Sequence, residues 1–418
     1  MISVENKKVI NNFLSLSILQ ALNYVLPLIT LPYLIQVLGV DKFGLVTFSA
    51  SLALYFNVIA DYGYKLTAPR DIAQNRNCLD TINEIVSVVL VSKLILLVFG
   101  FIVYFIIVFS VESFWIESKI YMLSFLVVVS QSMIPVWFFQ GMEDMKYVTV
   151  INVITKAIFL ILVFLFIKSE GDVYLLPLFT AVGFILTSLF CFYKMKVKYK
   201  YIFIKPTLTG LKNSFTNGFH IFVGNASTSL YTNTNIFLLG VLTTTSVVGY
   251  YSVAEKIVSA IAGLFIPLNQ ALYPYLSKKY IFDNKSFSPI IYKLSSFMLI
   301  IAFLFFLIFY FFKMDLLNVI SGGGDELTAL IISILSFRIL SSPFSNLFSN
   351  VLIIMNGKNE YLNVMKLTVV INTVITFPLI YVFDAVGLAV GLIIVLWLHT
   401  LLLAFYIKKR GLNYETAV

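Results

Sequence analysis

The sequence predicts an all-α polytopic membrane protein with about twelve transmembrane helices. Two features of the composition carry this prediction: 60% of the 418 residues are apolar, and only 12% are Asp, Glu, Lys or Arg. A soluble globular protein is about 25% charged and about 45–50% apolar, so the composition excludes an ordinary soluble enzyme. A third observation is that long apolar runs recur along the whole chain.

Each span is recognised as a run of about 20 mostly apolar residues, the length that crosses the hydrocarbon core as a helix. Most of these runs are free of charge, and the polar TTTS at 243–246 divides one run that is too long for a single span. We expect spans near 11–38, 43–61, 85–109, 120–139, 148–167, 173–193, 217–242, 249–274, 291–312, 327–355, 361–383 and 385–407.

The basic residues predict how the chain is oriented. An even number of spans places both termini on one side of the membrane. On that side the termini and loops hold about 20 of the 29 Lys and Arg residues, whereas the loops on the other side hold about 4. Because Lys and Arg are enriched on the cytoplasmic side of membrane proteins, both termini are predicted to be cytoplasmic. The net charge of +9 is explained in the same way, without nucleic acid.

The most basic loop, 194–216, divides the chain into two predicted six-helix lobes, 1–193 and 217–418. It contains KMKVKYKYIFIKP and is interpreted as a solvated cytoplasmic linker, or as a segment whose lysines attract anionic lipid headgroups. A short internal similarity favours the division. VLGVDKFGLVTFSA at 37–50 resembles VLTTTSVVGYYSVA at 241–254, as expected for two repeats of the same orientation.

The sequence offers little catalytic chemistry. Two cysteines and two histidines make a disulfide framework or a metal site improbable. The chain has no G-x-x-x-x-G-K-[ST] phosphate-binding motif, and SGGGDE at 321–326 is interpreted as a flexible turn outside the membrane. We therefore expect no cofactor and no metal, and a transporter rather than an enzyme.

Basic residues inside the predicted spans are the strongest candidates for a binding site. A charge within the bilayer is costly and faces a cavity, a partner or water. The candidates are Arg338, Lys93, Lys156 and Lys256, together with Lys366, which lies close enough to a span end to reach the interface. Within these spans only Glu255 is acidic, so a positively charged cavity that binds an anionic group is predicted. Structural pairing with carbonyl groups or with one another is the alternative.

Three further residues are candidates for coupling or gating. Asp61 closes the second span and Arg70 follows it, whereas Glu255 lies within the eighth span. The alternative for Asp61 and Arg70 is simple anchoring at the membrane interface. Proline removes a helical hydrogen bond and favours a kink, and predicted spans contain Pro27, Pro32, Pro135, Pro177, Pro267, Pro343 and Pro378.

Four segments resemble the O-antigen flippases, which belong to the polysaccharide transporter branch of the multidrug/oligosaccharidyl-lipid/polysaccharide exporter superfamily. They are LPYLIQVLGVDKFGLVTFSAS at 31–51, DYGYKLTAPRDIA at 61–73, PVWFFQGMEDMKY at 135–147 and YYSVAEKIVSAIAGLFIPLNQALYPYLS at 250–277. The resemblance implies two six-helix lobes around a central cavity and transport by alternating access. It also implies a bacterial inner-membrane location and a role in O-antigen, lipopolysaccharide and polysaccharide biosynthesis.

The substrate that the resemblance implies is an oligosaccharide repeat unit linked to undecaprenyl diphosphate, with membrane lipid, a polysaccharide polymerase and chain-length proteins as further partners. Two other classes remain open. A drug/cation antiporter of the same superfamily is expected to carry more buried carboxylates. An integral membrane enzyme of polysaccharide assembly is expected to carry a long loop outside the membrane.

Overall fold

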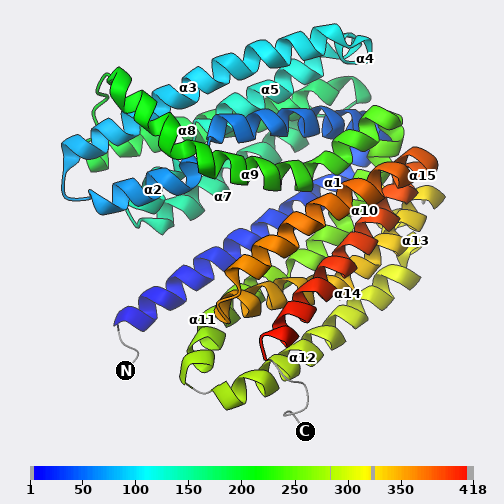
Figure 1. Cartoon of the computed structure of the whole chain (residues 1–418). Helices are drawn as coiled ribbons and strands as arrows, with labels where there is room; N and C mark the ends of the chain where they lie inside the picture. The colour runs from blue at the N-terminus through cyan, green and yellow to red at the C-terminus, as the bar shows by residue number, and fades with distance from the viewer. Residues whose placement is uncertain (1–3, 283, 322–324, 412–418) are drawn as a thin grey trace. The chain divides into compact units, whose positions relative to one another are not determined.

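The computed structural model describes residues 4–282, 284–321 and 325–411, and every regular element in them is a helix (Figure 1). The α-helices are α1 (Val4–Asp61), α2 (Tyr64–Gln74), α3 (Leu79–Ser110), α4 (Glu112–Ile116), α5 (Ser118–Ser132), α6 (Val136–Gly141), α7 (Met145–Phe166), α8 (Leu175–Tyr199), α9 (Leu208–Leu242), α10 (Thr245–Gly263), α11 (Phe265–Phe282), α12 (Asn284–Phe311), α13 (Lys313–Ser321), α14 (Glu326–Ile354) and α15 (Lys358–Lys409). A short 3₁₀-helix spans Glu170–Tyr174.

The all-α membrane fold predicted from the sequence is confirmed. Within the described residues, nine helical stretches are long and apolar enough to cross a membrane. Two of them, Leu26–Gln74 and Lys358–Lys409, have 49 and 52 residues, enough for two crossings each. The number twelve stays a prediction.

Breaks in the long helices fall close to the predicted span ends. Gly39 interrupts α1 with φ 76° and ψ 162°, between the first two predicted spans. Asp384 interrupts α15 with φ 50° and ψ −130°, between the last two. The predicted spans 120–139 and 249–274 each consist of two helices. Helix α5 ends at Ser132, before Pro135, and Leu264 separates α10 from α11.

Two compact units make up the chain, and each is described by itself. Unit 1 comprises Met1–Gln36 and Leu238–Val418, and unit 2 comprises Val37–Phe237. Helices α1 and α9 therefore contribute residues to both units. The predicted lobes, 1–193 and 217–418, stay a prediction about the arrangement in the membrane.

Much of the predicted linker 194–216 is helical. Helix α8 continues to Tyr199 and α9 begins at Leu208, so only 200–207 connects them. The chain leaves α8 at Lys200, whose φ of 53° is left-handed, and the Tyr201 amide closes the helix end by donating to the Met195 carbonyl over 3.1 Å. This geometry is a common helix termination.

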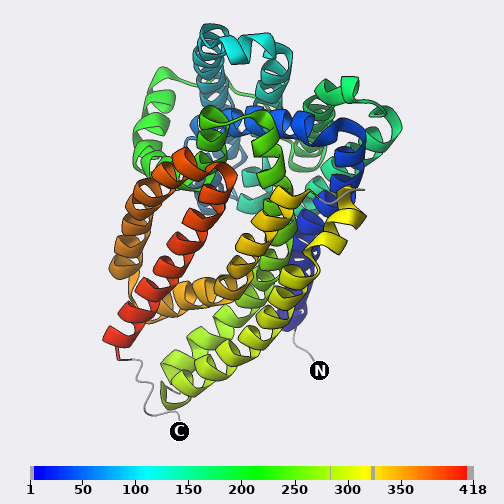
Figure 2. The same cartoon turned by 90° about the vertical axis from the view of Figure 1, so that its right-hand side faces the viewer.

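Unit 1 is organised around α14, which packs against α10, α11, α12 and α15 (Figure 1). The two arms of α15 form an antiparallel pair, seen in orange and red in Figure 2. A hydrogen bond of 2.9 Å joins Thr368 on one arm to Nδ1 of His399 on the other. Gly387 permits the close approach of the arms, since a Cβ there would lie 1.8 Å from the Leu379 carbonyl oxygen.

In unit 2, α8 packs against α5 and α7, whereas α2 packs against α3 and α6. One turn in this unit recurs in unit 1. The amide of Asp144 donates to the Phe139 carbonyl over 2.9 Å, and the amide of Gly357 donates to the Leu352 carbonyl over 2.8 Å. The preceding residues, Glu143 and Asn356, have φ of 56° and 59°. The same turn thus enters α7 in one unit and α15 in the other.

Candidate functional site

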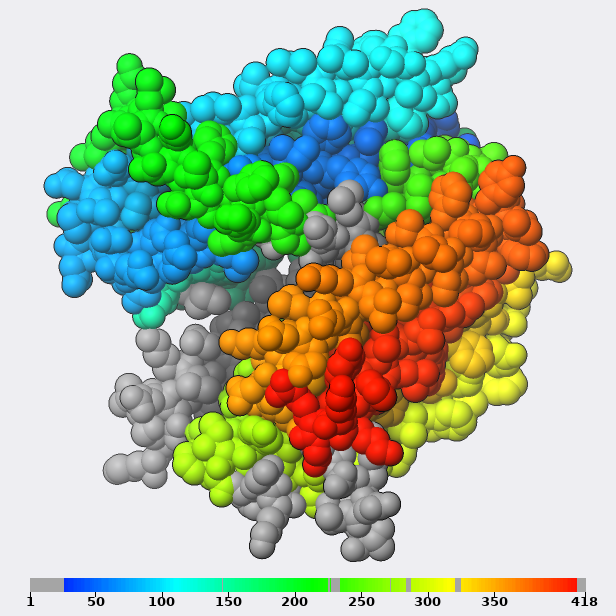
Figure 3. Space-filling model, viewed as in Figure 1, coloured from blue at the N-terminus to red at the C-terminus, as the bar shows by residue number. Residues whose placement is uncertain are grey.

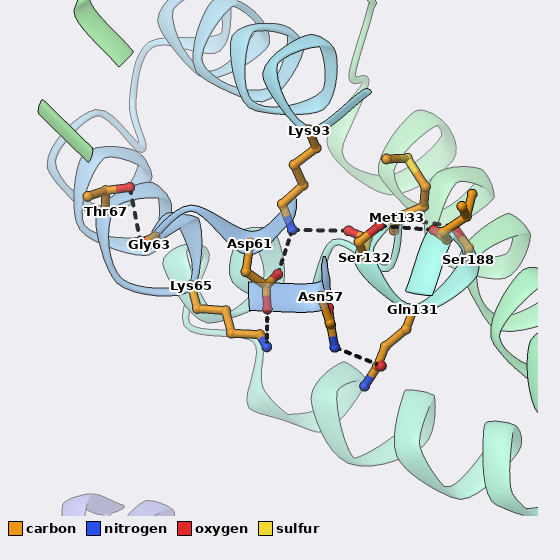
Figure 4. A network of polar contacts seen from close by, with 11 residues as sticks. Asn57, Asp61, Gly63, Lys65, Thr67, Lys93, Gln131, Ser132, Met133 and Ser188 are labelled. Atoms are coloured by element: carbon orange, nitrogen blue, oxygen red, sulfur yellow. Dashed lines mark hydrogen bonds and ion pairs between the residues drawn. The ribbon is translucent and has the colours of Figure 1, made fainter. Parts of the chain in front are cut away.

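In unit 2, Lys93 forms a buried ion pair with Asp61 (Figure 4). Lys93 lies 14 residues after the start of α3, about 21 Å along the helix axis. Its ammonium group is 3.1 Å from Oδ1 of Asp61 and donates to the Ser132 carbonyl over 3.0 Å. The Lys93 side chain is only 2% exposed, so these two acceptors replace the water that the charge has lost.

Asp61 ends α1 at a sharp turn. Tyr62 and Gly63 follow it with φ of 43° and 84°, and the chain then enters α2. A second basic side chain, that of Lys65, pairs with Oδ2 of Asp61 but is 66% exposed. One carboxylate therefore binds a buried lysine and an exposed lysine from two different helices.

A pair of amide side chains lies beside this ion pair. Nδ2 of Asn57 donates to Oε1 of Gln131 over 3.0 Å (Figure 4). Asn57 lies one turn before Asp61 on α1, and Gln131 directly precedes Ser132 on α5. The Oδ1 atom of Asn57 is buried and makes no hydrogen bond within the described part of the chain. This pair was not predictable from the sequence, because uncharged polar residues are too frequent in the predicted spans to single any out.

Unit 1 contains a second ion pair, between Arg338 of α14 and Glu255 of α10. Nη1 of Arg338 is 3.1 Å from Oε1 of Glu255 and donates to Oγ of Ser259 over 2.9 Å. Ser259 in turn donates to the same carboxylate over 2.5 Å. Within the described residues both contacts use Nη1, which leaves Nε and Nη2 of the guanidinium for another partner.

The Arg338–Glu255 pair is less buried than the Lys93–Asp61 pair. The Arg338 side chain is 29% exposed and that of Glu255 is 26% exposed. An arginine presents planar N–H donors that match a phosphate in a bidentate geometry. The arrangement therefore combines a structural ion pair with donors that an anionic ligand can reach.

These contacts correct one expectation. The sequence analysis set four buried basic residues against one acid, Glu255. The structure adds a second carboxylate, Asp61, which neutralises Lys93. The excess of positive charge is therefore smaller than expected. Asp61 was placed at a span end in the sequence, and packing of α3 against that end brings the two groups together.

The remaining candidates differ in exposure. Lys156 on α7 and Lys256 on α10 are half-buried, and Lys256 directly follows Glu255. Lys366 on α15 is exposed. Arg70 on α2 is also exposed and pairs with its neighbour Asp71 over 2.9 Å. The structure thus brings together two pairs, one in each unit, and a single cavity lined by all the candidates stays a prediction.

The described residues contain no group of three or more His, Cys, Asp and Glu side chains that could hold a metal ion. In each of the two ion pairs, one carboxylate compensates the basic side chain. The Ser132 carbonyl is an additional partner of Lys93, and the Ser259 hydroxyl is an additional partner of Arg338.

Comparison with known families decides the family of this chain. Residues 9–280, more than half of the sequence, match the family model described as polysaccharide biosynthesis protein. The chain belongs to this family. The resemblance seen in the four sequence segments is thereby confirmed, and all four lie within the matched region.

Two curated relatives of this polysaccharide biosynthesis family member match nearly its full length. A protein of Escherichia coli K12 named "Putative O-antigen transporter" is 25% identical over 402 residues, covering 96% of this chain and 97% of the relative. A protein of Shigella dysenteriae with the same name is 28% identical over 424 residues, covering 95% of this chain and 98% of the relative.

Solved structures share the fold at low sequence identity. The inward-facing structure of a multidrug resistance MATE transporter of the MOP superfamily superposes with a TM-score of 0.70 at 14% identity, covering 94% of this chain and 98% of that one. The lipid II flippase MurJ in an inward closed conformation gives a TM-score of 0.67 at 16% identity, covering 96% and 87%.

Proposed function

We propose that this protein is a flippase that moves oligosaccharide repeat units linked to undecaprenyl diphosphate from the cytoplasmic leaflet of the bacterial inner membrane to the periplasmic leaflet. Both termini are cytoplasmic in this proposal, and transport occurs by alternating access. Support comes from the family match and from the names of the two curated relatives. The protein performs no chemical step on the glycan.

The observation that carries the proposal is the state of Arg338. Its charge is compensated by Glu255 and Ser259 of α10. Among the described residues Nε and Nη2 make no hydrogen bond or ion pair, and the side chain is partly exposed. A diphosphate needs strong, planar N–H donors in a place from which water is largely excluded. Arg338 provides these donors and is the proposed diphosphate ligand. Lys156, Lys256 and Lys366 stay candidates for additional positive charge, whereas the charge of Lys93 is neutralised by Asp61.

The two carboxylates, Asp61 and Glu255, are the proposed coupling groups. Each one neutralises a basic residue inside its own unit, so protonation or cation binding at either carboxylate changes the charge of that cluster by one. A conformational equilibrium shifts only when a ligand binds its two states with different affinity. We propose that the carboxylates supply this difference, with Arg70, exposed on the helix α2 that follows Asp61, as a further candidate for gating.

The antiporter alternative is disfavoured by the same contacts. A cationic drug needs a carboxylate that is available, whereas Asp61 and Glu255 are each bound by a basic side chain from the same unit. A cation would have to displace Lys93 or Arg338 from its partner.

Deletion of the gene tests the proposal in cells. Without the flippase, lipid-linked repeat units are expected to accumulate with their glycan facing the cytoplasm, and expression of the wild-type protein is expected to reverse this. Accumulation of repeat units on the periplasmic side would instead assign the protein to a later step, such as polymerisation.

A further inference from the structure

The segment 200–207, KYIFIKPT, is attached along α3 by its backbone. The amide of Ile202 donates to Oδ1 of Asn83 over 3.2 Å, and the amide of Ile204 donates to Oγ of Ser87 over 3.0 Å. The hydroxyl groups of Tyr201 and Ser87 are 3.2 Å apart. Two buried polar side chains of α3 thus accept hydrogen bonds from backbone amides of the segment, which is not part of a helix or strand.

This attachment leaves apolar side chains on the outside. Ile202 is 67% exposed and Phe203 is 57% exposed, and Ile204 is exposed as well. Figure 3 shows the start of α9 and the residues around 200, in green, at the surface of unit 2. In a membrane protein, exposed apolar side chains of this kind are suited to contact with lipid.

The position of the segment along α3 places it at the edge of the membrane. With 32 residues, α3 is about 48 Å long, about 18 Å more than the hydrocarbon core. If the excess is shared between the two ends, the core begins about 9 Å from Leu79. Asn83 lies about 6 Å from Leu79 along the helix and Ser87 about 12 Å, so the two residues lie on either side of that boundary.

Exposed lysines flank the apolar side chains. Lys196, Lys200 and Lys205 are all exposed, whereas Lys198 pairs with Asp144. No acidic residue occurs in 194–212. The nearest acidic group on α3 is Glu84, which faces Gly210 at the start of α9. The surface of the segment is therefore basic and apolar together.

We infer that 196–205 is a binding surface for anionic phospholipid headgroups of the inner leaflet. The exposed lysines attract the phosphate groups, and Ile202, Phe203 and Ile204 insert at the boundary between headgroups and acyl chains, as basic and aromatic residues do at membrane surfaces. The choice of leaflet rests on the cytoplasmic orientation proposed above, whereas the lipid preference does not.

Site-directed fluorescence quenching tests the lipid preference. Cys78 and Cys191 are replaced by Ser and Ala, Phe203→Cys is labelled with bimane, and the protein is placed in nanodiscs. Brominated phosphatidylglycerol is expected to quench this label about two-fold more than brominated phosphatidylcholine at the same mole fraction. In Lys196→Gln/Lys200→Gln/Lys205→Gln the two lipids are expected to quench equally.

A label at Ile300→Cys provides the matched control. Ile300 on α12 is 62% exposed, and its label is expected to be quenched equally by both lipids. Equal quenching at position 203 in the protein with all three lysines, or no quenching at all, would overturn the inference. Stronger quenching by a brominated undecaprenyl phosphate, with no difference between phosphatidylglycerol and phosphatidylcholine, would also overturn it. The occupant of the surface would then be the substrate lipid. None of these readouts requires transport.

Discussion

The ammonium group of Lys93 lies 3.1 Å from the carboxylate of Asp61, although 31 residues separate them and the lysine side chain is almost fully buried. The same carboxylate binds Lys65, whose side chain is mostly exposed. The two lysines thus bind the same carboxylate, one in a buried and one in an exposed position. Their variants therefore compare the contribution of a buried and an exposed ion pair to stability.

Asp61→Asn is expected to destabilise the protein by about 3 kcal/mol, because it leaves the buried charge of Lys93 without a counter-ion. Lys93→Met added to Asp61→Asn is expected to recover most of the loss. Lys65→Met is expected to cost less than about 1 kcal/mol, since exposed ion pairs contribute little. Thermal unfolding of the purified variants measures these differences. Equal stability of Asp61→Asn and Lys65→Met would show that the buried pair is not structural.

Arg338→Ala is expected to abolish surface polysaccharide, because it removes the proposed diphosphate ligand, and the other arginine of unit 1, Arg410, pairs with Glu360 instead. Arg338→Lys is expected to be partly active, since an ammonium group keeps the ion pair but lacks a planar fork. Export of polysaccharide and the amount of membrane-inserted protein are measured together.

The double variant Arg338→Ala/Glu255→Ala tests whether Arg338 has only a structural role. If the arginine binds substrate, the double variant accumulates normally and still fails to export. Recovery of export along with protein amount would reduce Arg338 to a structural role.

Gly63→Ala is expected to destabilise unit 2 by at least about 1 kcal/mol. The residue has φ 84°, a conformation that costs other residues about 1–2 kcal/mol, and a Cβ there would lie 2.8 Å from Cγ2 of Ile221. Gly224→Ala on α9 is the control, because a Cβ at that position meets nothing within 4 Å. It is expected to be neutral or slightly stabilising in thermal unfolding. A neutral Gly63→Ala would contradict the turn geometry after Asp61.

Thiol labelling of intact cells tests the orientation. Cysteines at Ser321 and Thr244 are expected to react with an impermeant reagent, whereas one at Asn213 is not. Native Cys78, which lies in a loop predicted to be cytoplasmic, serves as an internal control. It is exposed, and a hydrogen bond from Thr81 lowers the pKa of its thiol, so it is expected to react once the membrane is permeabilised. Labelling at Asn213 with protection at Thr244 would reverse the topology.

The sequence predicted the helices well because lipid imposes a simple rule, about 20 apolar residues for each crossing. Gly39 and Asp384 break their helices between predicted spans. The effect of a proline was less predictable. The helix is broken before Pro135 but continues through Pro343, because neighbouring packing decides whether a helix tolerates the lost hydrogen bond.

Buried charges were identifiable from the sequence, but their partners were only partly so. Structural pairing of the basic residues was the stated alternative, and Glu255, the one acid in their spans, is the partner of Arg338. The pairing of Lys93 with Asp61 was not, because it depends on the depth at which α3 packs beside the end of α1. The Asn57–Gln131 pair had no signal, since neither residue is charged.

Transport by the purified protein tests the central claim most directly. Proteoliposomes are loaded with a fluorescent oligosaccharide linked to undecaprenyl diphosphate, and an added reagent destroys the label on the outer leaflet only. With wild-type protein, label initially on the inner leaflet is expected to become accessible, whereas protein-free vesicles and Arg338→Ala vesicles keep about half of the total label protected. Protection of the same fraction by wild-type protein, under an imposed proton or sodium gradient as well as without one, would contradict the proposed flippase.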